Sequence, residues 1–133
     1  MKVLVDTDVW SEALRRKKGK KSTYVDELVD LIQEGRLEII GPIRMEVLSG
    51  IRDKEVFDAF SDILTAFSDR PIESEVYILA AKFSNECRKK GVQGGHIDFL
   101  ICAIASRHRI SILTLDNDFK HYSKIIDIEL MVF

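Results

Sequence analysis

The sequence predicts a single three-layer α/β/α domain, in which helices cover both faces of a central, mainly parallel sheet. The chain has 133 residues, the size of one ordinary domain, and no repeat, low-complexity tract or linker divides residues 1–133. Short runs of consecutive apolar residues alternate with segments whose apolar residues recur at helical spacing. Strands that are apolar on both faces are typical of parallel sheets buried between helices.

Four segments are predicted to be strands because they are short and apolar. They are Lys2–Asp6, Leu37–Ile40, Ile110–Leu115 and Ile128–Phe133.

The segments between and after these strands are predicted to be helices. Ser22 is a suitable N-cap, Pro42 suits the first turn of a helix, and Gly35 and Gly91 are typical of helix ends. The predicted helices are one capped by Thr7 or Asp8, one from Ser22 to Gly35, one from Gly41 to about Gly50, and then Lys54–Phe67, about Glu73–Lys90, Ile97–Ser106 and Asp118–Ser123.

Charge is unevenly distributed along the chain. The net charge is −2, but six of the seven residues in Arg15–Lys21 are basic. The rest of the sequence carries 14 basic and 22 acidic residues. One part of the molecule is therefore suited to bind a polyanion while another part is acidic, although a solvated loop also explains such a block.

The composition indicates a cytoplasmic protein. No apolar run approaches the ~20 residues needed to span a bilayer. The apolar run before Asp6 is shorter than the core of a secretory signal. Cys87 and Cys102 fit no metal-ligand spacing, so we expect free, buried thiols.

Two aspartates directly follow predicted strands. Asp6 ends the first strand, and Asp116 follows the apolar run that ends at Leu115. An aspartate at such a position commonly caps the next helix. Two of them, each with a further acid nearby at Asp8 and Asp118, also predict a shared site, since the carboxyl ends of neighbouring parallel strands meet at one edge of the sheet.

Asp98 and Glu46 lie in the predicted helices of other strand–helix units, at positions that correspond to those of the first two acids. Asp98 shares a helix face with Ile101, Cys102 and Ala105, where a carboxylate needs a partner or a metal. Its place in the first turn, where the helix dipole favours an acid, is a second explanation. Glu46 lies one turn into its helix and on its own would be read as a solvated residue.

If these acids converge, their mutual repulsion favours a bound cation. Like charges a few ångströms apart repel by about 1–4 kcal/mol at an effective dielectric constant of 80–20. Sites built from carboxylate oxygens suit Mg²⁺ or Mn²⁺.

Four segments resemble the PIN-domain family, and within it the VapC-type toxins. They are Val3-Leu4-Val5-Asp6-Thr7-Asp8, Pro42-Ile43-Arg44-Met45-Glu46-Val47-Leu48-Ser49-Gly50, Gly95-His96-Ile97-Asp98-Phe99-Leu100-Ile101-Cys102-Ala103 and Leu113-Thr114-Leu115-Asp116-Asn117-Asp118-Phe119. They occur in the family's order and spacing. Asp8 is a departure, because the family often has a neutral residue there.

The resemblance implies a toxin ribonuclease, usually a homodimer, that a VapB-type antitoxin holds inactive. It places the metal and catalytic residues at Asp6, Glu46 and Asp98, with Asp116 ranked before Asp118 as the fourth acid. The expected reaction is hydrolysis of an RNA phosphodiester by water that Mg²⁺ or Mn²⁺ activates. Thr7 and Thr114 are expected to orient carboxylates. The basic block is not a hallmark of this family. Arg15, Arg16, Lys17 and Lys18 are expected RNA contacts within it, with a solvated loop as the alternative.

Two other functions fit parts of the sequence. The chain could be a PIN-like RNA-binding module that has lost its activity. Asp6-Thr7-Asp8 is also similar to the first motif of haloacid-dehalogenase phosphatases, Asp-x-Asp-x-Thr or Val, but Trp10 stands at its last position.

Overall fold

The structure, a computed structural model, describes residues 1–15 and 22–133, except for the side chain of Arg15. Its strands are β1 (Val3–Val5), β2 (Leu37–Glu38) and β3 (Ser111–Leu113). Its helices are α1 (Thr7–Arg15), α2 (Thr23–Gln33), α3 (Gly41–Ser49), α4 (Lys54–Leu64), α5 (Ser74–Lys89), α6 (His96–His108) and α7 (Asp118–Ser123).

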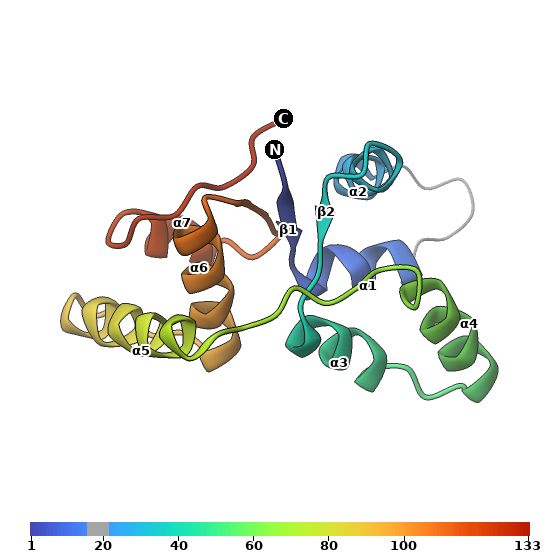
Figure 1. The fold of residues 1–133 in the computed structure, drawn as a ribbon, viewed down its shortest axis with the longest axis horizontal. Coiled ribbons are helices and arrows are strands. Elements are labelled where there is room, and N and C mark those ends of the chain that lie inside the picture. Colours follow the sequence, from blue (N-terminus) through green and yellow to red (C-terminus); the bar gives the residue numbers. More distant parts are fainter. Residues whose placement is uncertain (16–21) are drawn as a thin grey trace.

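The described strands form a parallel sheet in the order β2-β1-β3. Val3 pairs with Leu37 on one side and with Ser111 on the other. In Figure 1, α5, α6 and α7 lie on one side of the strands, and α1, α2 and α4 lie on the other. The predicted three-layer α/β class is therefore confirmed.

The sheet is smaller than the sequence predicts. Within the described chain, the predicted last strand, Ile128–Phe133, pairs only through the isolated bridge between Leu130 and Ile112. Ile128 and Leu130 pack on the core, but Val132 is 90% exposed. The prediction of a full strand was wrong, because an apolar run shows that side chains are suited to burial and not that the backbone pairs.

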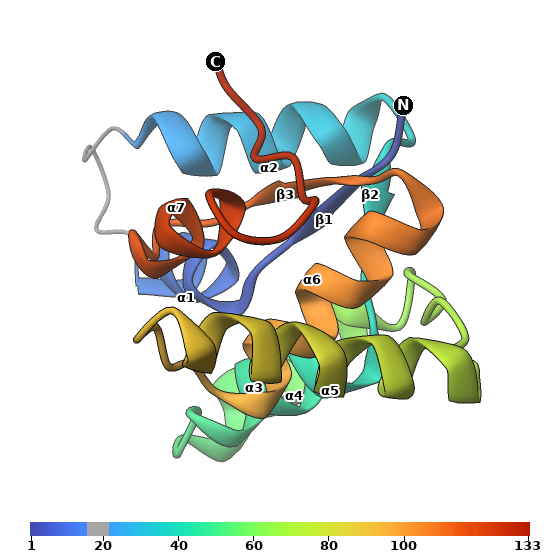
Figure 2. The ribbon, with the colours of Figure 1, turned by 90° about the vertical axis from the view of Figure 1, so that its left-hand side faces the viewer.

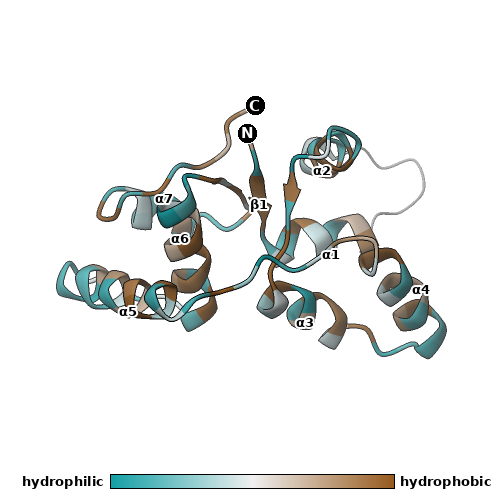
Figure 3. Ribbon diagram, in the orientation of Figure 1, coloured by the Kyte–Doolittle hydropathy of each residue, from teal (hydrophilic) through white to brown (hydrophobic). Residues whose placement is uncertain are grey.

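The core is built on β1 and α6. Val3, Leu4 and Val5 are each at most 1% exposed, and seven consecutive residues of α6, Phe99–Ala105, are buried. Figure 3 shows hydrophobic residues on both elements. In Figure 2, α6 passes behind α5, the helix with which it makes its most extensive contact. This helix is thus enclosed on nearly all sides, as its almost wholly apolar sequence requires.

The carboxyl ends of the strands and the two termini lie at opposite ends of the molecule. β1 runs from the N-terminus directly into α1, and β2 leads into α3, both at the lower end of Figure 1. Both termini lie at the upper end in Figures 1 and 2. The segments that follow the strands are therefore gathered at one end of the sheet.

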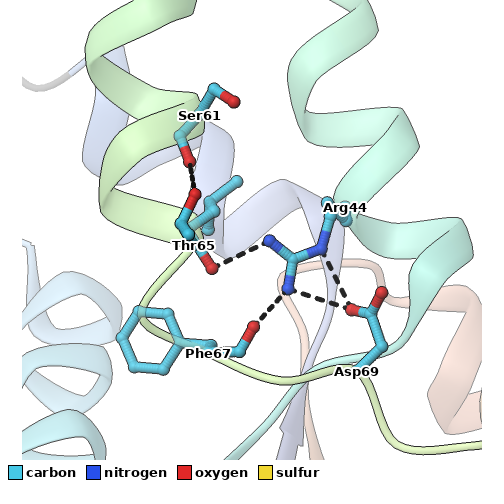
Figure 4. A network of polar contacts seen from close by, with 6 residues as sticks. Arg44, Ser61, Thr65, Phe67 and Asp69 are labelled. Atoms are coloured by element: carbon cyan, nitrogen blue, oxygen red, sulfur yellow. Dashed lines mark hydrogen bonds and ion pairs between the residues drawn. The ribbon is translucent and has the colours of Figure 1, made fainter.

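Arg44 ties α3 to the end of α4, as Figure 4 shows. Its guanidinium donates to the carbonyl of Leu64 at 2.8 Å and to the carbonyl of Phe67, and it pairs with Asp69 at 3.0 Å. The Leu64 carbonyl also accepts from the Phe67 N–H at 3.0 Å, whereas the Phe67 carbonyl lies beyond the end of α4 and accepts from Arg44. The interaction anchors α3, the helix that carries Glu46.

The described residues include no helix that is both long and apolar enough to cross a membrane. Cys87 and Cys102 are free and buried, as the sequence predicts.

Candidate metal centre

Asp6 lies at the junction between β1 and α1. Its backbone carbonyl accepts from the Val9 N–H at 3.2 Å, so Asp6 occupies the capping position that the sequence assigned to Thr7 or Asp8. Its carboxylate accepts from the Thr7 N–H at 2.8 Å and from the Thr114 hydroxyl at 2.8 Å. The residue is only 7% exposed. The local structure thus fixes this carboxylate at the carboxyl end of β1.

Thr114 connects the two strand ends. Its hydroxyl oxygen lies 2.8 Å from Oδ2 of Asp6 and 3.3 Å from Oδ2 of Asp8, and it accepts from the Asp116 N–H at 3.0 Å. A hydroxyl has a single proton, so it donates to one carboxylate at a time. The oxygens of Asp6 and Asp8 are therefore close neighbours around one side chain.

Asp8 is the acid that the resemblance left outside the site. Both of its carboxylate oxygens accept from the Leu115 N–H, at 3.1 and 3.2 Å. Burial raises its pKa, the neighbouring Asp116 raises it further, and the hydrogen bonds from Leu115 and Thr114 lower it. Asp8 is therefore held against the segment that follows β3.

Asp98 is half-buried in the first turn of α6. The Tyr122 hydroxyl donates to its Oδ2 at 3.2 Å. Burial is the main cause of a raised pKa at Asp98, and Asp116 and Glu46 raise it as well. The charges of Glu46 on α3 and of Asp116 after β3 therefore act on Asp98.

Glu46 is exposed on α3 and is connected to the others through Thr7. The Thr7 hydroxyl donates to Oε1 of Glu46 at 3.0 Å, while the Thr7 N–H donates to Asp6. One threonine thus joins the acid of α3 to the acid that ends β1.

Asp116 and Asp118 differ in their relation to the other acids. The charge of Asp116 raises the pKa of both Asp8 and Asp98. Asp118 is exposed, and its N–H donates to Oδ1 of Asp116 at 2.9 Å. These contacts make Asp116 the nearer of the two to the shared group of acids.

Asp6 shows the largest electrostatic effect among these acids. Its pKa is raised to about 7, first by burial and then by the charges of Asp8 and Asp98. Hydrogen bonds from Thr114 and Thr7 oppose this rise without cancelling it. The fold therefore holds a buried carboxyl beside other acids, an arrangement that a cation would stabilise.

A comparison with models of known families matches residues 3–125 to the PIN domain. The chain belongs to the PIN-domain family. Two curated relatives of this PIN domain are "Ribonuclease VapC11" of Mycobacterium tuberculosis and "VapC ribonuclease Mb1587" of Mycobacterium bovis. Each is 26% identical over 133 residues, and the match covers 98% of this chain and 98% of the relative.

Solved structures share the fold of this PIN domain. VapBC2 from Rickettsia felis, bound to a DNA fragment from its promoter, matches with a TM-score of 0.78 at 19% identity, over 98% of each chain. FitAcB from Neisseria gonorrhoeae matches with a TM-score of 0.77 at 21% identity, over 98% of this chain and 96% of that chain.

The donor chemistry of these acids fits Mg²⁺ or Mn²⁺. The acids of the site offer carboxylate oxygens, which hard cations prefer. The described residues contain no group of three or more acids, histidines or cysteines already placed to ligate one ion. Mg²⁺ usually keeps several waters and takes one or two carboxylates, which Asp6 and Asp98 can provide without such a group.

Sequence reasoning missed two residues of this region, Tyr122 and Gly94. Tyr122 bonds to Asp98 from 24 residues away, and Gly94 lies against the Tyr122 hydroxyl. No spacing along the sequence signals either contact. The predicted RNA contacts Arg16, Lys17 and Lys18 lie outside the described residues, as does the side chain of Arg15.

Proposed function

We propose that this chain is a Mg²⁺- or Mn²⁺-dependent endoribonuclease and the toxin of a type II toxin–antitoxin pair. The observation that carries the proposal is the buried Asp6 carboxyl, whose pKa is raised to about 7 beside Asp8 and Asp98 at the carboxyl edge of the sheet. The similarity to ribonucleases of the VapC type over nearly the whole chain supports the same reaction.

Asp6 and Asp98 would hold the principal cation, and Glu46 and Asp116 would complete the site or hold a second ion, with Asp118 beside them. Bound there, a divalent cation lowers the pKa of water and stabilises charge on the phosphate. The Thr114 hydroxyl donates to Oδ2 of Asp6 at 2.8 Å, and the Thr7 hydroxyl donates to Oε1 of Glu46 at 3.0 Å. These hydroxyls donate to the ionised form of each acid, the form that binds a cation.

The proposed partners are RNA as substrate, a VapB-type antitoxin and a second copy of this chain. The solved structures that share the fold include VapBC2 and FitAcB. Size-exclusion chromatography with light scattering tests the homodimer, and co-purification with the product of an adjacent small gene tests the antitoxin.

The alternative is a PIN-like module that binds RNA without cleaving it. Weak binding of cations would favour this alternative, because the described residues include no group of three or more acids, histidines or cysteines already placed to ligate one ion. Protection of RNA without cleavage would identify it. The phosphatase reading requires an aspartate nucleophile, and release of phosphate from a small ester would identify that function instead.

The decisive experiment is cleavage of structured RNAs, including tRNA, by the purified chain. We expect cleavage with Mg²⁺ or Mn²⁺, none with EDTA, and none by Asp98→Asn. The matched control is Asp62→Asn, which changes an exposed acid of α4 and should cleave normally. Cleavage by pure Asp98→Asn protein at the wild-type rate would overturn the proposal.

A further inference from the structure

We propose that Tyr122 is a positioning residue that orients the Asp98 carboxylate for cation binding; this inference rests on the proposed function. Tyr122 lies on α7, and Asp98 lies in the first turn of α6. The Tyr122 hydroxyl donates to Oδ2 of Asp98 at 3.2 Å, and no other side chain among the described residues donates to this carboxylate.

The ring of Tyr122 is rigidly held. The residue is fully buried, at 0% exposure. Its ring centroid lies 4.9 Å from that of Phe99 and 5.2 Å from that of Phe119. Phe99 follows Asp98 directly in α6, and Phe119 precedes Tyr122 by three residues in α7. The hydroxyl therefore reaches Asp98 from a ring that both helices fix, so its direction is set by the fold.

Gly94 gives the hydroxyl its space. A Cβ added at Gly94 would lie 2.2 Å from the Tyr122 hydroxyl oxygen and 2.8 Å from Cζ. Any larger residue at this position must move the tyrosine or the loop before α6. The glycine thus permits a close approach between this loop and the hydroxyl that contacts Asp98.

A hydroxyl at this position has a specific chemical effect. It donates a hydrogen bond to one carboxylate oxygen, which limits rotation of the carboxylate. Phenylalanine would fill the same volume but could not donate. The orienting role therefore resides in one oxygen atom, while the packing role resides in the ring.

This separation makes the proposal testable with Tyr122→Phe. We would titrate Mn²⁺ into wild-type protein and Tyr122→Phe by calorimetry, without RNA. The control is Tyr24→Phe, which removes a hydroxyl from a ring that packs at 5.0 Å from Phe133. Loss of a partner that orients a ligand commonly lowers metal affinity about 10–100-fold. We expect a loss of about 10-fold for Tyr122→Phe and no change for Tyr24→Phe.

A second readout separates orientation from general damage. In RNA cleavage, Tyr122→Phe should need more Mn²⁺ for half-maximal rate but reach nearly the wild-type rate when Mn²⁺ saturates. If Tyr122→Phe does not fold, Gly94→Ala replaces it, since an added Cβ must move the tyrosine or the loop before α6 and so change the contact between the hydroxyl and Asp98. We expect weaker Mn²⁺ binding in this variant as well.

The outcomes distinguish this inference from the proposed function. Wild-type Mn²⁺ affinity in folded Tyr122→Phe, with only its melting temperature lowered, would show that the tyrosine is structural and would overturn the positioning role alone. Failure of wild-type protein to bind Mn²⁺ would overturn the cation site and this inference together.

Discussion

At the scale of single residues, Asp6 combines burial with the neighbourhood of other acids. Its side chain is fixed by Thr7 and Thr114, so it cannot turn away from Asp8. Its native pKa of about 7 lies above the value of about 3.9 expected in the unfolded chain. The native state therefore binds this proton more tightly, and stability contributed by the group is lost as the pH rises towards 7.

We predict that Asp6→Asn stabilises the metal-free protein at pH 8 but not at pH 5. The rise in pKa corresponds to an upper limit of about 4 kcal/mol. The observed gain should be about 1–2 kcal/mol, because asparagine cannot accept both hydrogen bonds equally well. Melting temperatures in EDTA from pH 5 to 8 measure it. A difference between the two proteins that does not grow with pH would contradict the assignment.

Thr114 tests the link between the strand ends. Thr114→Val keeps the shape of the side chain but removes the hydroxyl that contacts Asp6, Asp8 and the Asp116 N–H. We predict about 10-fold weaker Mn²⁺ binding by calorimetry. Thr114→Ser, which retains the hydroxyl, is the matched control and should bind as wild type does. Equal affinity in the valine variant would show that the hydroxyl does not orient these acids.

At the scale of elements, α3 depends on Arg44 for its attachment to α4. The guanidinium satisfies the carbonyls of Leu64 and Phe67 and pairs with Asp69. We predict that Arg44→Ala lowers the free energy of unfolding by about 1–3 kcal/mol, because it removes the donor to the Phe67 carbonyl and the partner of Asp69. Urea denaturation measures this change.

The control for Arg44 is Lys54→Ala, which breaks the exposed pair with Asp58 one helical turn away. Exposed pairs of this kind contribute less than about 0.5 kcal/mol. If both variants lose the same stability, Arg44 does not anchor α3.

An element can be predicted from the sequence when the residues that determine it lie within its own segment. The limits of α6 were predicted to within two residues, because a nearly all-apolar segment must be enclosed and the glycines before it mark its start. The pairing of Ile128–Phe133 was overestimated, since apolar side chains can pack without a ladder of backbone hydrogen bonds.

The same distinction applies to the acids. The sequence places Asp6 and Asp116 at one edge because parallel strands end there, and in the structure the Thr114 hydroxyl contacts the Asp6 carboxylate and the Asp116 backbone N–H. The contact of Tyr122 with Asp98 depends on how α7 packs on α6. No periodic pattern in the sequence indicates this contact, so it could not be predicted from the sequence.

At the scale of the whole molecule, the proposed function requires an acidic site to attract a polyanion. Outside Arg15–Lys21 the chain carries 14 basic and 22 acidic residues, so the block supplies a large share of its positive charge. We predict that replacing Arg16, Lys17 and Lys18 with serine weakens RNA binding by Asp98→Asn protein. The slope of log K for RNA binding against the logarithm of the salt concentration should become shallower by up to about 2, at about 0.7 for each phosphate contact that is lost.

The matched control for this charge change is replacement of Lys54, Lys82 and Lys89, which lie on α4 and α5. Filter binding at several salt concentrations compares the two variants at equal net charge. Equal losses of affinity would show that net charge, and not the basic block, determines RNA binding.

The most direct test of the whole account is the rate of RNA cleavage as a function of Mn²⁺ concentration. If the carboxyl edge of the sheet both binds the cation and performs the reaction, the half-maximal rate should occur at the Mn²⁺ dissociation constant measured by calorimetry. Weakening that constant through Thr114→Val should shift the rate curve by the same factor. Cleavage that persists in EDTA, or that saturates independently of the measured affinity, would contradict a metal site at Asp6 and Asp98.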